Sequence, residues 1–425
     1  MKKVTRVLTA ILALILMCSM AAVSASAAVS QPASKSVTAS AAVSQPASKS
    51  VSAVAAGAQP ASNQAVASAT ASQHASNQAV ASATASQPAS NQPATYSTTA
   101  SQPLNVPAGL MLPGDRKIPT FISPYHYSKE LPPTLTFGDL NFSNPAVERA
   151  TQVYLAATKQ LTRQTNTPSF KMDTGDGSID VYTIQPDDTQ TRPAILYCHG
   201  GGFMFPVQAN QIAFSKIFVE KTGARVFLPD YRCAPEYPFP TPFEDCYETY
   251  LYMLNHADEL HIDPKKIIVY GDSAGGSLAA AVCQKARDEH VQAPAAQMLI
   301  YPVTDNSQTT KSLDEYAYGA WSKTSNRQMW EIYLKNGDYG ELQYAAPLQA
   351  KDFSNLPKAY VEPSEMDALR DEGIAYADKL KSAGNDVTVN IIKGAYHGFD
   401  GQLFSPLTRR VFETRTQFMN AVFQK

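Results

Sequence analysis

The stretch Val269-Tyr270-Gly271-Asp272-Ser273-Ala274-Gly275-Gly276 decides how the rest of this 425-residue chain is interpreted. It follows a short apolar run (266–270) and precedes a helical pattern, so it predicts a strand, a tight turn and a helix. A serine on a strained turn needs neighbours without bulky side chains, and glycines stand two residues before and after Ser273. Its hydroxyl would lie near the positive end of the helix. Because this spacing also occurs in ordinary Gly-Ser loops, other parts of the chain must support the interpretation.

The first 27 residues have the pattern of a secretory leader. Basic residues at the start are followed by an apolar run from Val7 to Met17 and by Ala25-Ser26-Ala27, which resembles a signal-peptidase site. The apolar run is short for a membrane span. A lipoprotein signal at Cys18 is a weaker alternative, because Met17 stands where a small residue would be expected. We expect cleavage after residue 27 and a secreted protein.

Residues 28–103 form a low-complexity segment. Gln31, Gln45, Gln59, Gln73 and Gln87 each begin a similar unit, so the repeat has a period of 14 residues. Nothing in one unit could form a buried core, and the period matches no usual solenoid. The composition predicts a disordered spacer. Attachment to the cell envelope is an alternative function for it, with the folded domain as cargo.

The remaining residues, 104–425, are acidic. All 37 acidic residues lie there but only 30 of the 35 basic ones, which leaves a net charge of −7. This charge and the absence of a basic run argue against nucleic acid as a partner. No Cys-x-x-Cys pair or Cys/His cluster indicates a metal, and no other pattern indicates a cofactor. Four cysteines follow the leader, and most lie in apolar patterns typical of buried thiols.

Strand and helix patterns alternate through this region. Strands are expected at 170–172, 179–184, 194–198, 225–229, 266–270, 297–301, 359–362 and 387–392, and helices at 146–162, 208–221, 242–256, 274–287, 371–382 and 407–423. Short apolar strands alternating with longer helices predict an α/β fold, with a mostly parallel sheet covered on both faces. Residues 305–344 interrupt the alternation with aromatic, helix-like stretches. They predict a lid over one end of the sheet, although their aromatic side chains could equally form the core of that insertion.

Three further sequence features are consistent with a reactive serine at position 273. A strand at 194–198 runs into His199-Gly200-Gly201-Gly202-Phe203, where bare amides could approach a substrate oxygen. Asp367 follows a late strand, with Asp305 as its main rival. His397 lies after the last strand, which gives the chain order serine, acid, histidine of one class of hydrolases.

Together these blocks resemble the hormone-sensitive-lipase-like family of α/β-hydrolase carboxylesterases. The matching segments are His199-Gly200-Gly201-Gly202-Phe203, Asp230-Tyr231-Arg232-Cys233-Ala234-Pro235-Glu236, Gly271-Asp272-Ser273-Ala274-Gly275-Gly276, Asp367-Ala368-Leu369-Arg370-Asp371-Glu372-Gly373 and His397-Gly398-Phe399. They occur in the family's order and cover about two thirds of the chain. Ala368 departs from the family's usual proline, and Cys233 from a common leucine.

The resemblance implies an α/β-hydrolase fold with a helical cap, built from about 104–165 and 305–344. It implies a Ser273 nucleophile, an Asp367 acid and a His397 base, with an oxyanion hole made by the amides of Gly201, Gly202 and Ala274. Phe203, Trp321 and Trp330 are then expected at the substrate pocket. The substrate is expected to be an acyl ester with a short acyl chain. Alternatives are removal of acyl groups from polysaccharides, amide or peptide hydrolysis, and a binding protein that uses the fold without catalysis.

Overall fold

The computed structural model describes residues 125–131, 156, 159–160, 162, 169–316 and 321–424. The predicted leader, the repeat segment, most of the predicted helix at 146–162 and most of the first cap segment lie outside the described residues. Within the described part, no helix combines the length and apolar character needed to cross a bilayer.

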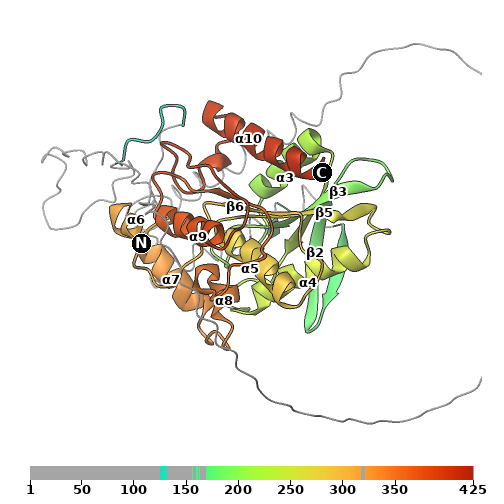
Figure 1. Ribbon diagram of the computed structural model, residues 1–425, viewed down its shortest axis with the longest axis horizontal. Coiled ribbons are helices and arrows are strands. Elements are labelled where there is room, and N and C mark those ends of the chain that lie inside the picture. Colours follow the sequence, from blue (N-terminus) through green and yellow to red (C-terminus); the bar gives the residue numbers. More distant parts are fainter. Residues whose placement is uncertain are drawn as a thin grey trace, which may run out of the picture. The chain divides into compact units, whose positions relative to one another are not determined.

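Eight strands of the described chain form one sheet in the order β1-β2-β4-β3-β5-β6-β7-β8 (Figure 1). The strands are β1 (Phe170–Thr174), β2 (Gly177–Ile184), β3 (Arg192–Cys198), β4 (Arg225–Asp230), β5 (Ile262–Asp272), β6 (Ala296–Ile300), β7 (Ala359–Glu362) and β8 (Val387–Val389). The pairs β1–β2 and β2–β4 are antiparallel, and the other neighbours are parallel. The predicted mostly parallel sheet is therefore confirmed.

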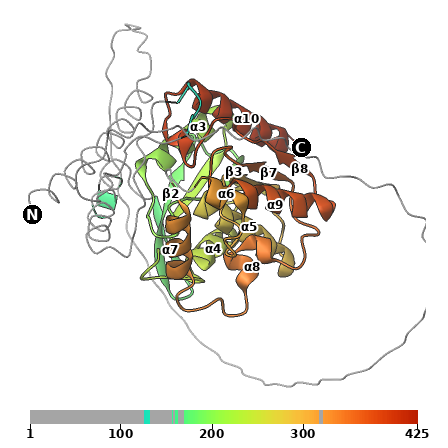
Figure 2. The ribbon, with the colours of Figure 1, turned by 90° about the vertical axis from the view of Figure 1, so that its left-hand side faces the viewer.

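Five longer helices cover the two faces of this sheet: α3 (Ala209–Thr222), α4 (Thr241–Asn255), α5 (Ala274–Asp288), α9 (Arg370–Ser382) and α10 (Pro406–Phe423). Side chains of α4, α5 and α9 share one buried cluster, and those of α3 and α10 share another. The two groups of helices lie on opposite sides of the strands in both views (Figures 1 and 2). Successive side chains of a strand point to opposite faces of the sheet, which accounts for the two clusters. In β5, Ile267 and Val269 belong to the first cluster, whereas Ile268 and Tyr270 belong to the second.

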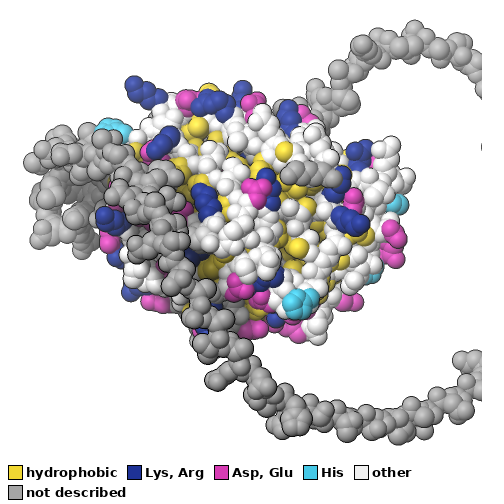
Figure 3. Space-filling model, viewed as in Figure 1, with side chains coloured by type: hydrophobic (Ala, Val, Ile, Leu, Met, Phe, Trp, Pro, Cys, Tyr) yellow, Lys and Arg dark blue, Asp and Glu magenta, His cyan; other side chains and the backbone are white. Residues whose placement is uncertain are grey.

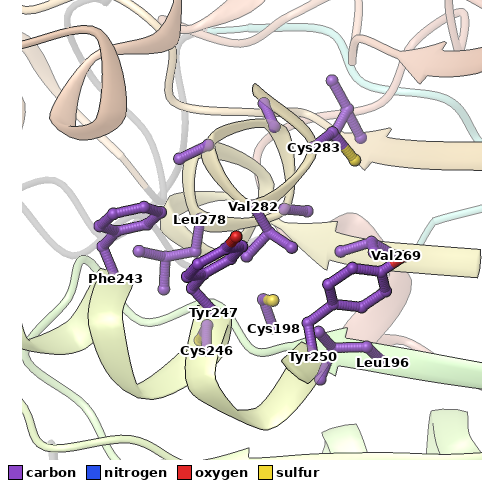
Figure 4. Close-up of a cluster of buried hydrophobic side chains, with 14 of the residues drawn as sticks. Leu196, Cys198, Phe243, Cys246, Tyr247, Tyr250, Val269, Leu278, Val282 and Cys283 are labelled. Atoms are coloured by element: carbon purple, nitrogen blue, oxygen red, sulfur yellow. The ribbon is translucent and has the colours of Figure 1, made fainter. Parts of the chain in front are cut away.

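The centre of the first cluster contains three free cysteines. Cys198 of β3, Cys246 of α4 and Cys283 of α5 lie among apolar side chains between these elements (Figure 4). Burial raises the pKa of the Cys246 and Cys283 thiols well above the usual value. They therefore act as small apolar groups in the core.

Between β6 and β7 the chain forms α6 (Lys311–Glu315), α7 (Lys323–Tyr333), α8 (Leu342–Ala345) and a short 3-10 turn, η1 (Pro347–Gln349). Ser277 of α5 donates a hydrogen bond to the Ala345 carbonyl at 2.9 Å, which links α8 to α5. Ser322 caps α7 by accepting a hydrogen bond from the Ser325 amide at 3.1 Å. On the face shown in Figure 3, basic and acidic side chains are interspersed.

Most strand ends differ from the sequence prediction by one or two residues, and two boundaries differ by more. β5 begins at Ile262 rather than at Lys266, because Ile262 pairs with Arg192 across a break in register. β8 ends at Val389, and residue Ile392 makes only an isolated bridge to Ser364. Both differences lie at strand ends, where polar residues hide the apolar periodicity.

Candidate active site

Ser273 lies on the turn between β5 and α5. Its backbone has φ 56° and ψ −123°, a conformation that is costly for a residue with a side chain. A Cβ atom at Gly271 would lie 2.0 Å from the Gly275 carbonyl oxygen, and one at Gly275 would lie 2.0 Å from the Cys198 carbonyl oxygen. Both positions therefore require glycine. The Ser273 amide donates to the Ile300 carbonyl at 2.9 Å, which fastens the turn to β6.

His397 connects Ser273 to Asp367. The Oγ atom of Ser273 lies 2.9 Å from Nε2 of His397, and Nδ1 of His397 lies 2.8 Å from Oδ2 of Asp367. The Asp367 side chain is completely buried, and the His397 side chain is 11% exposed. The amide of Leu369 donates to Oδ1 of Asp367 at 3.0 Å and fixes the carboxylate. A proton on Nδ1 facing Asp367 leaves the lone pair of Nε2 directed at the serine hydroxyl.

Asp305, the rival acid, is engaged elsewhere. Its Oδ1 accepts hydrogen bonds from the Ser307 amide at 3.0 Å and from Nε2 of Gln349 at 2.6 Å, and its Oδ2 accepts from Oγ of Ser307 at 2.5 Å. These bonds hold the start of the insertion in place. Of the two carboxylates, the structure brings only Asp367 to His397.

The glycine loop after β3 lies against this turn. Gly201 and Gly202 have φ values of 126° and 61°, in the region that favours glycine. The amides of Gly201, Gly202 and Ala274 donate no hydrogen bond to another residue of the described chain. The Ala274 amide belongs to the first turn of α5, where helical N–H groups lack intrahelical partners. These three amides therefore remain free to donate to a bound ligand.

Comparisons with known proteins identify the fold and the family. A family model described as alpha/beta hydrolase fold matches residues 195–401. An arylesterase of Saccharolobus solfataricus is 32% identical over 246 residues, which cover 57% of this chain and 79% of the relative. A solved structure titled "Bacterial Heroin Esterase" has 32% identity and a TM-score of 0.60, and the match covers 67% of this chain and 94% of that one. The chain belongs to the hormone-sensitive-lipase-like family of α/β-hydrolases.

Other relatives of this α/β-hydrolase are matched over less of their length. Carboxylic ester hydrolase LipN of Mycobacterium tuberculosis is 34% identical over 230 residues, which cover 52% of this chain and 61% of the relative. Lipase 2 of a Moraxella species is 30% identical, and the match covers 53% of this chain and 60% of the relative. The family and the fold expected from the sequence are thus confirmed.

Of the three predicted pocket residues, only Trp321 lies beside the reacting groups. Its ring centre is 5.8 Å from that of His397, and its indole Cη2 lies 3.1 Å from the point where a Gly202 side chain would begin. Phe203 is completely buried and stacks on Tyr333 with ring centres 3.7 Å apart. Trp330 is also buried, 6.1 Å from Phe203. Phe203 and Trp330 therefore join the glycine loop to α7.

Asp272 and His199 support the glycine loop of the hydrolase, a role that the sequence did not reveal. Asp272 Oδ1 accepts a hydrogen bond from the Gly200 amide at 3.2 Å, and burial raises the pKa of this carboxyl to about 6. His199 is buried and stacked on Tyr231, and desolvation lowers its pKa to about 4. His199 is therefore neutral at pH 7. The only sequence feature that could have indicated this role is the position of Asp272 directly before Ser273.

A buried ionic cluster lies behind His397. Arg415 of α10 donates to Glu362 at 2.6 Å and to Asp400 at 2.8 Å, and the side chains of Arg415 and Glu362 are completely buried. Tyr301 donates to Asp400 at 2.6 Å, and its ring lies 4.9 Å from that of His397. The cluster thus connects α10 and β7 to the loop that carries the histidine. An arginine on the otherwise apolar face of α10 was the only sequence signal for it.

No group of three His, Cys, Asp or Glu side chains in the described ranges is arranged to hold a metal ion.

Proposed function

We propose that this chain is a carboxylic ester hydrolase that works through a covalent acyl-enzyme on Ser273. The observation that carries the proposal is the continuous hydrogen-bonded chain from Oγ of Ser273 through the His397 imidazole to Asp367, with distances of 2.9 and 2.8 Å. The names carried by the relatives, carboxylic ester hydrolase, lipase and arylesterase, support the same class of reaction.

In the first step, Nε2 of His397 takes the proton of Ser273 while Oγ attacks the ester carbonyl carbon. Asp367 stabilises the imidazolium that forms and keeps its Nδ1 proton in place. The imidazolium then gives its proton to the departing alcohol oxygen, which leaves the acyl group on Ser273. Water, deprotonated by His397, hydrolyses this ester and regenerates the serine.

Negative charge develops on the carbonyl oxygen in both tetrahedral intermediates. The amides of Gly201, Gly202 and Ala274 are the proposed donors to this oxygen, because they have no other partner among the described residues. Loss of a single donor of this kind typically lowers the rate by about 10²–10³-fold. The bond between Asp272 and the Gly200 amide holds the loop that carries two of them.

The decisive experiment compares the wild type with Ser273→Ala on p-nitrophenyl acetate. Removal of a triad serine lowers kcat by roughly 10⁶-fold in serine hydrolases, and a loss of several orders of magnitude is expected here. An active-site phosphonate should label the wild type with a stoichiometry of one and leave the variant unlabelled. Turnover by Ser273→Ala close to that of the wild type would overturn the proposal.

Short acyl esters are the proposed substrates, and amides or acylated polysaccharides are the alternatives. Matched ester and anilide substrates with the same acyl group distinguish an esterase from an amidase, because only the leaving atom differs. Acetylated oligosaccharides test the third possibility. A protein that binds ligands without catalysis would show no turnover of any of these compounds.

We also propose that the enzyme is secreted, with residues 1–27 removed as a leader and residues 28–103 acting as a spacer. The support is the sequence pattern alone: a basic start, an apolar run and Ala25-Ser26-Ala27. Mass spectrometry of protein from the culture medium should give a mature N-terminus at Ala28. Deletion of residues 28–103, followed by assays of activity and of attachment to cells, separates a spacer from an adhesion segment.

A further inference from the structure

Trp321 lies close to both Gly202 and His397. On one side its indole lies against Gly202, where a side chain would begin only 3.1 Å from Cη2. On the other side its ring centre is 5.8 Å from the His397 imidazole, with an angle of 34° between the ring planes. Trp321 therefore spans the gap between the proposed oxyanion donors and the proposed base.

The chemistry of an ester identifies which part of the substrate enters this gap. The carbonyl oxygen must face the amides of Gly201 and Gly202, and the alcohol oxygen must lie within reach of Nε2 of His397. In the preferred conformation of an ester, the alcohol substituent lies on the same side as the carbonyl oxygen. That substituent therefore extends from the alcohol oxygen alongside the carbonyl oxygen, on the side of Gly202 and Trp321, whereas the acyl chain leaves in the opposite direction.

The indole is held in one orientation by its own segment. Its Nε1 donates to Oδ1 of Asn326 at 3.1 Å. Asn326 is completely buried in the first turn of α7, a turn that Ser322 caps. A side chain fixed in this way presents a rigid wall rather than one that rotates to admit larger groups.

We propose that Trp321 forms the wall of the alcohol subsite and that Asn326 is the positioning residue for it. This proposal rests on the proposed esterase activity. The preferred substrates are then esters of flat or short alcohols, such as phenols, which can stack on the indole face. Branched or long alcohols collide with it. The preference for acyl chain length does not depend on Trp321.

Two substrate series test the assignment: acetates of increasing alcohol size, from phenyl and ethyl to tert-butyl and cyclohexyl, and phenyl esters of increasing acyl length. In Trp321→Ala, the ratio of kcat/KM for cyclohexyl acetate to that for phenyl acetate should rise at least about tenfold, in the range that one lost steric contact produces. The dependence on acyl length should not change. Asn326→Ala should shift the same ratio in the same direction by less.

Trp330→Phe is the matched control, because Trp330 belongs to the same insertion and has no ring contact with His397 in the described structure. It should leave the alcohol ratio unchanged even where it lowers the unfolding midpoint. Trp321→Phe serves if Trp321→Ala does not fold. A changed acyl profile, or an unchanged alcohol ratio in active Trp321 variants, would overturn the assignment. If the wild type hydrolyses none of these esters, the esterase proposal itself is contradicted.

Discussion

Asp272 and His199 should give the protein opposite pH dependences of stability, and Asp272→Asn separates them. Burial raises the pKa of Asp272 from 3.8 to about 6. Between these values the native state binds a proton that the unfolded state has released. The contribution to stability is therefore fully present below pH 3.8 and is lost as the pH rises through about 6. A shift of this size corresponds to about 3 kcal/mol.

His199 acts in the other direction. Desolvation lowers its pKa from 6.5 to about 4, so between these values the unfolded state binds a proton that the native state excludes. Stability is then lost as the pH falls from 6.5 toward 4, again by about 3 kcal/mol. From pH 4 to 6 the two slopes, each about 1.4 kcal/mol per pH unit, cancel.

Urea unfolding at half-unit steps from pH 4.5 to 7.5 measures the free energy of unfolding of the wild type and of Asp272→Asn. Asparagine still accepts the Gly200 hydrogen bond but does not titrate. The difference in unfolding free energy between the two proteins should be constant above pH 6.5. As the pH falls below 6, the variant should become less stable than the wild type by a further amount of about 1.4 kcal/mol for each pH unit. Parallel curves over the whole range would refute the reasoning, because they would show that Asp272 titrates alike in both states.

Three further outcomes follow from the contacts. Asp367→Asn should lower kcat by about 10⁴-fold, whereas Asp305→Asn should leave it within a few-fold, in assays with p-nitrophenyl acetate; a larger loss at Asp305 would reassign the acid. Arg415→Met leaves Glu362 and Asp400 buried without their partner and should cost about 3–5 kcal/mol in urea unfolding, partly restored in Arg415→Lys; a loss below about 1 kcal/mol would contradict the role of the ion pairs. Gly275→Ala, with its 2.0 Å approach to the Cys198 carbonyl, should yield no active soluble protein, while Gly401→Ala, which meets nothing within 4 Å, should express and unfold like the wild type.

The local part of the site could be predicted from the sequence because its signals are short. Glycines flank Ser273 at fixed spacing, three glycines follow β3, and His397 comes after the last strand. The choice between Asp367 and Asp305 needed the structure, since both follow strands. The resemblance favoured Asp367, and two observations separate the carboxylates: Asp367 lies 2.8 Å from Nδ1 of His397, whereas Asp305 is bonded to Ser307 and Gln349.

Long-range contacts explain what the sequence did not reveal. Glu362, Asp400 and Arg415 come from three elements, and no periodicity joins them. The same holds for Phe203 and Tyr333, which are separated by more than a hundred residues and yet stack face to face. Aromatic residues in the insertion could be counted from the sequence, but their division between packing and substrate contact depends on the fold.

The stack of Phe203 on Tyr333 has a mechanical consequence. Tyr333 is the last residue of α7, and its carbonyl also accepts a hydrogen bond from the Phe239 amide at 2.9 Å, so this end of the helix is anchored. Any rearrangement of α7 that keeps these contacts is a rotation about Tyr333. The other end of α7, at Lys323, lies roughly 15 Å along the helix axis, given a rise of about 1.5 Å per residue, and Trp321 precedes the N-cap Ser322 there. A tilt at this anchor would move the indole most, and the close approach of Trp321 to Gly202 opposes that motion, so the two ends of the segment are fixed by the same glycine loop.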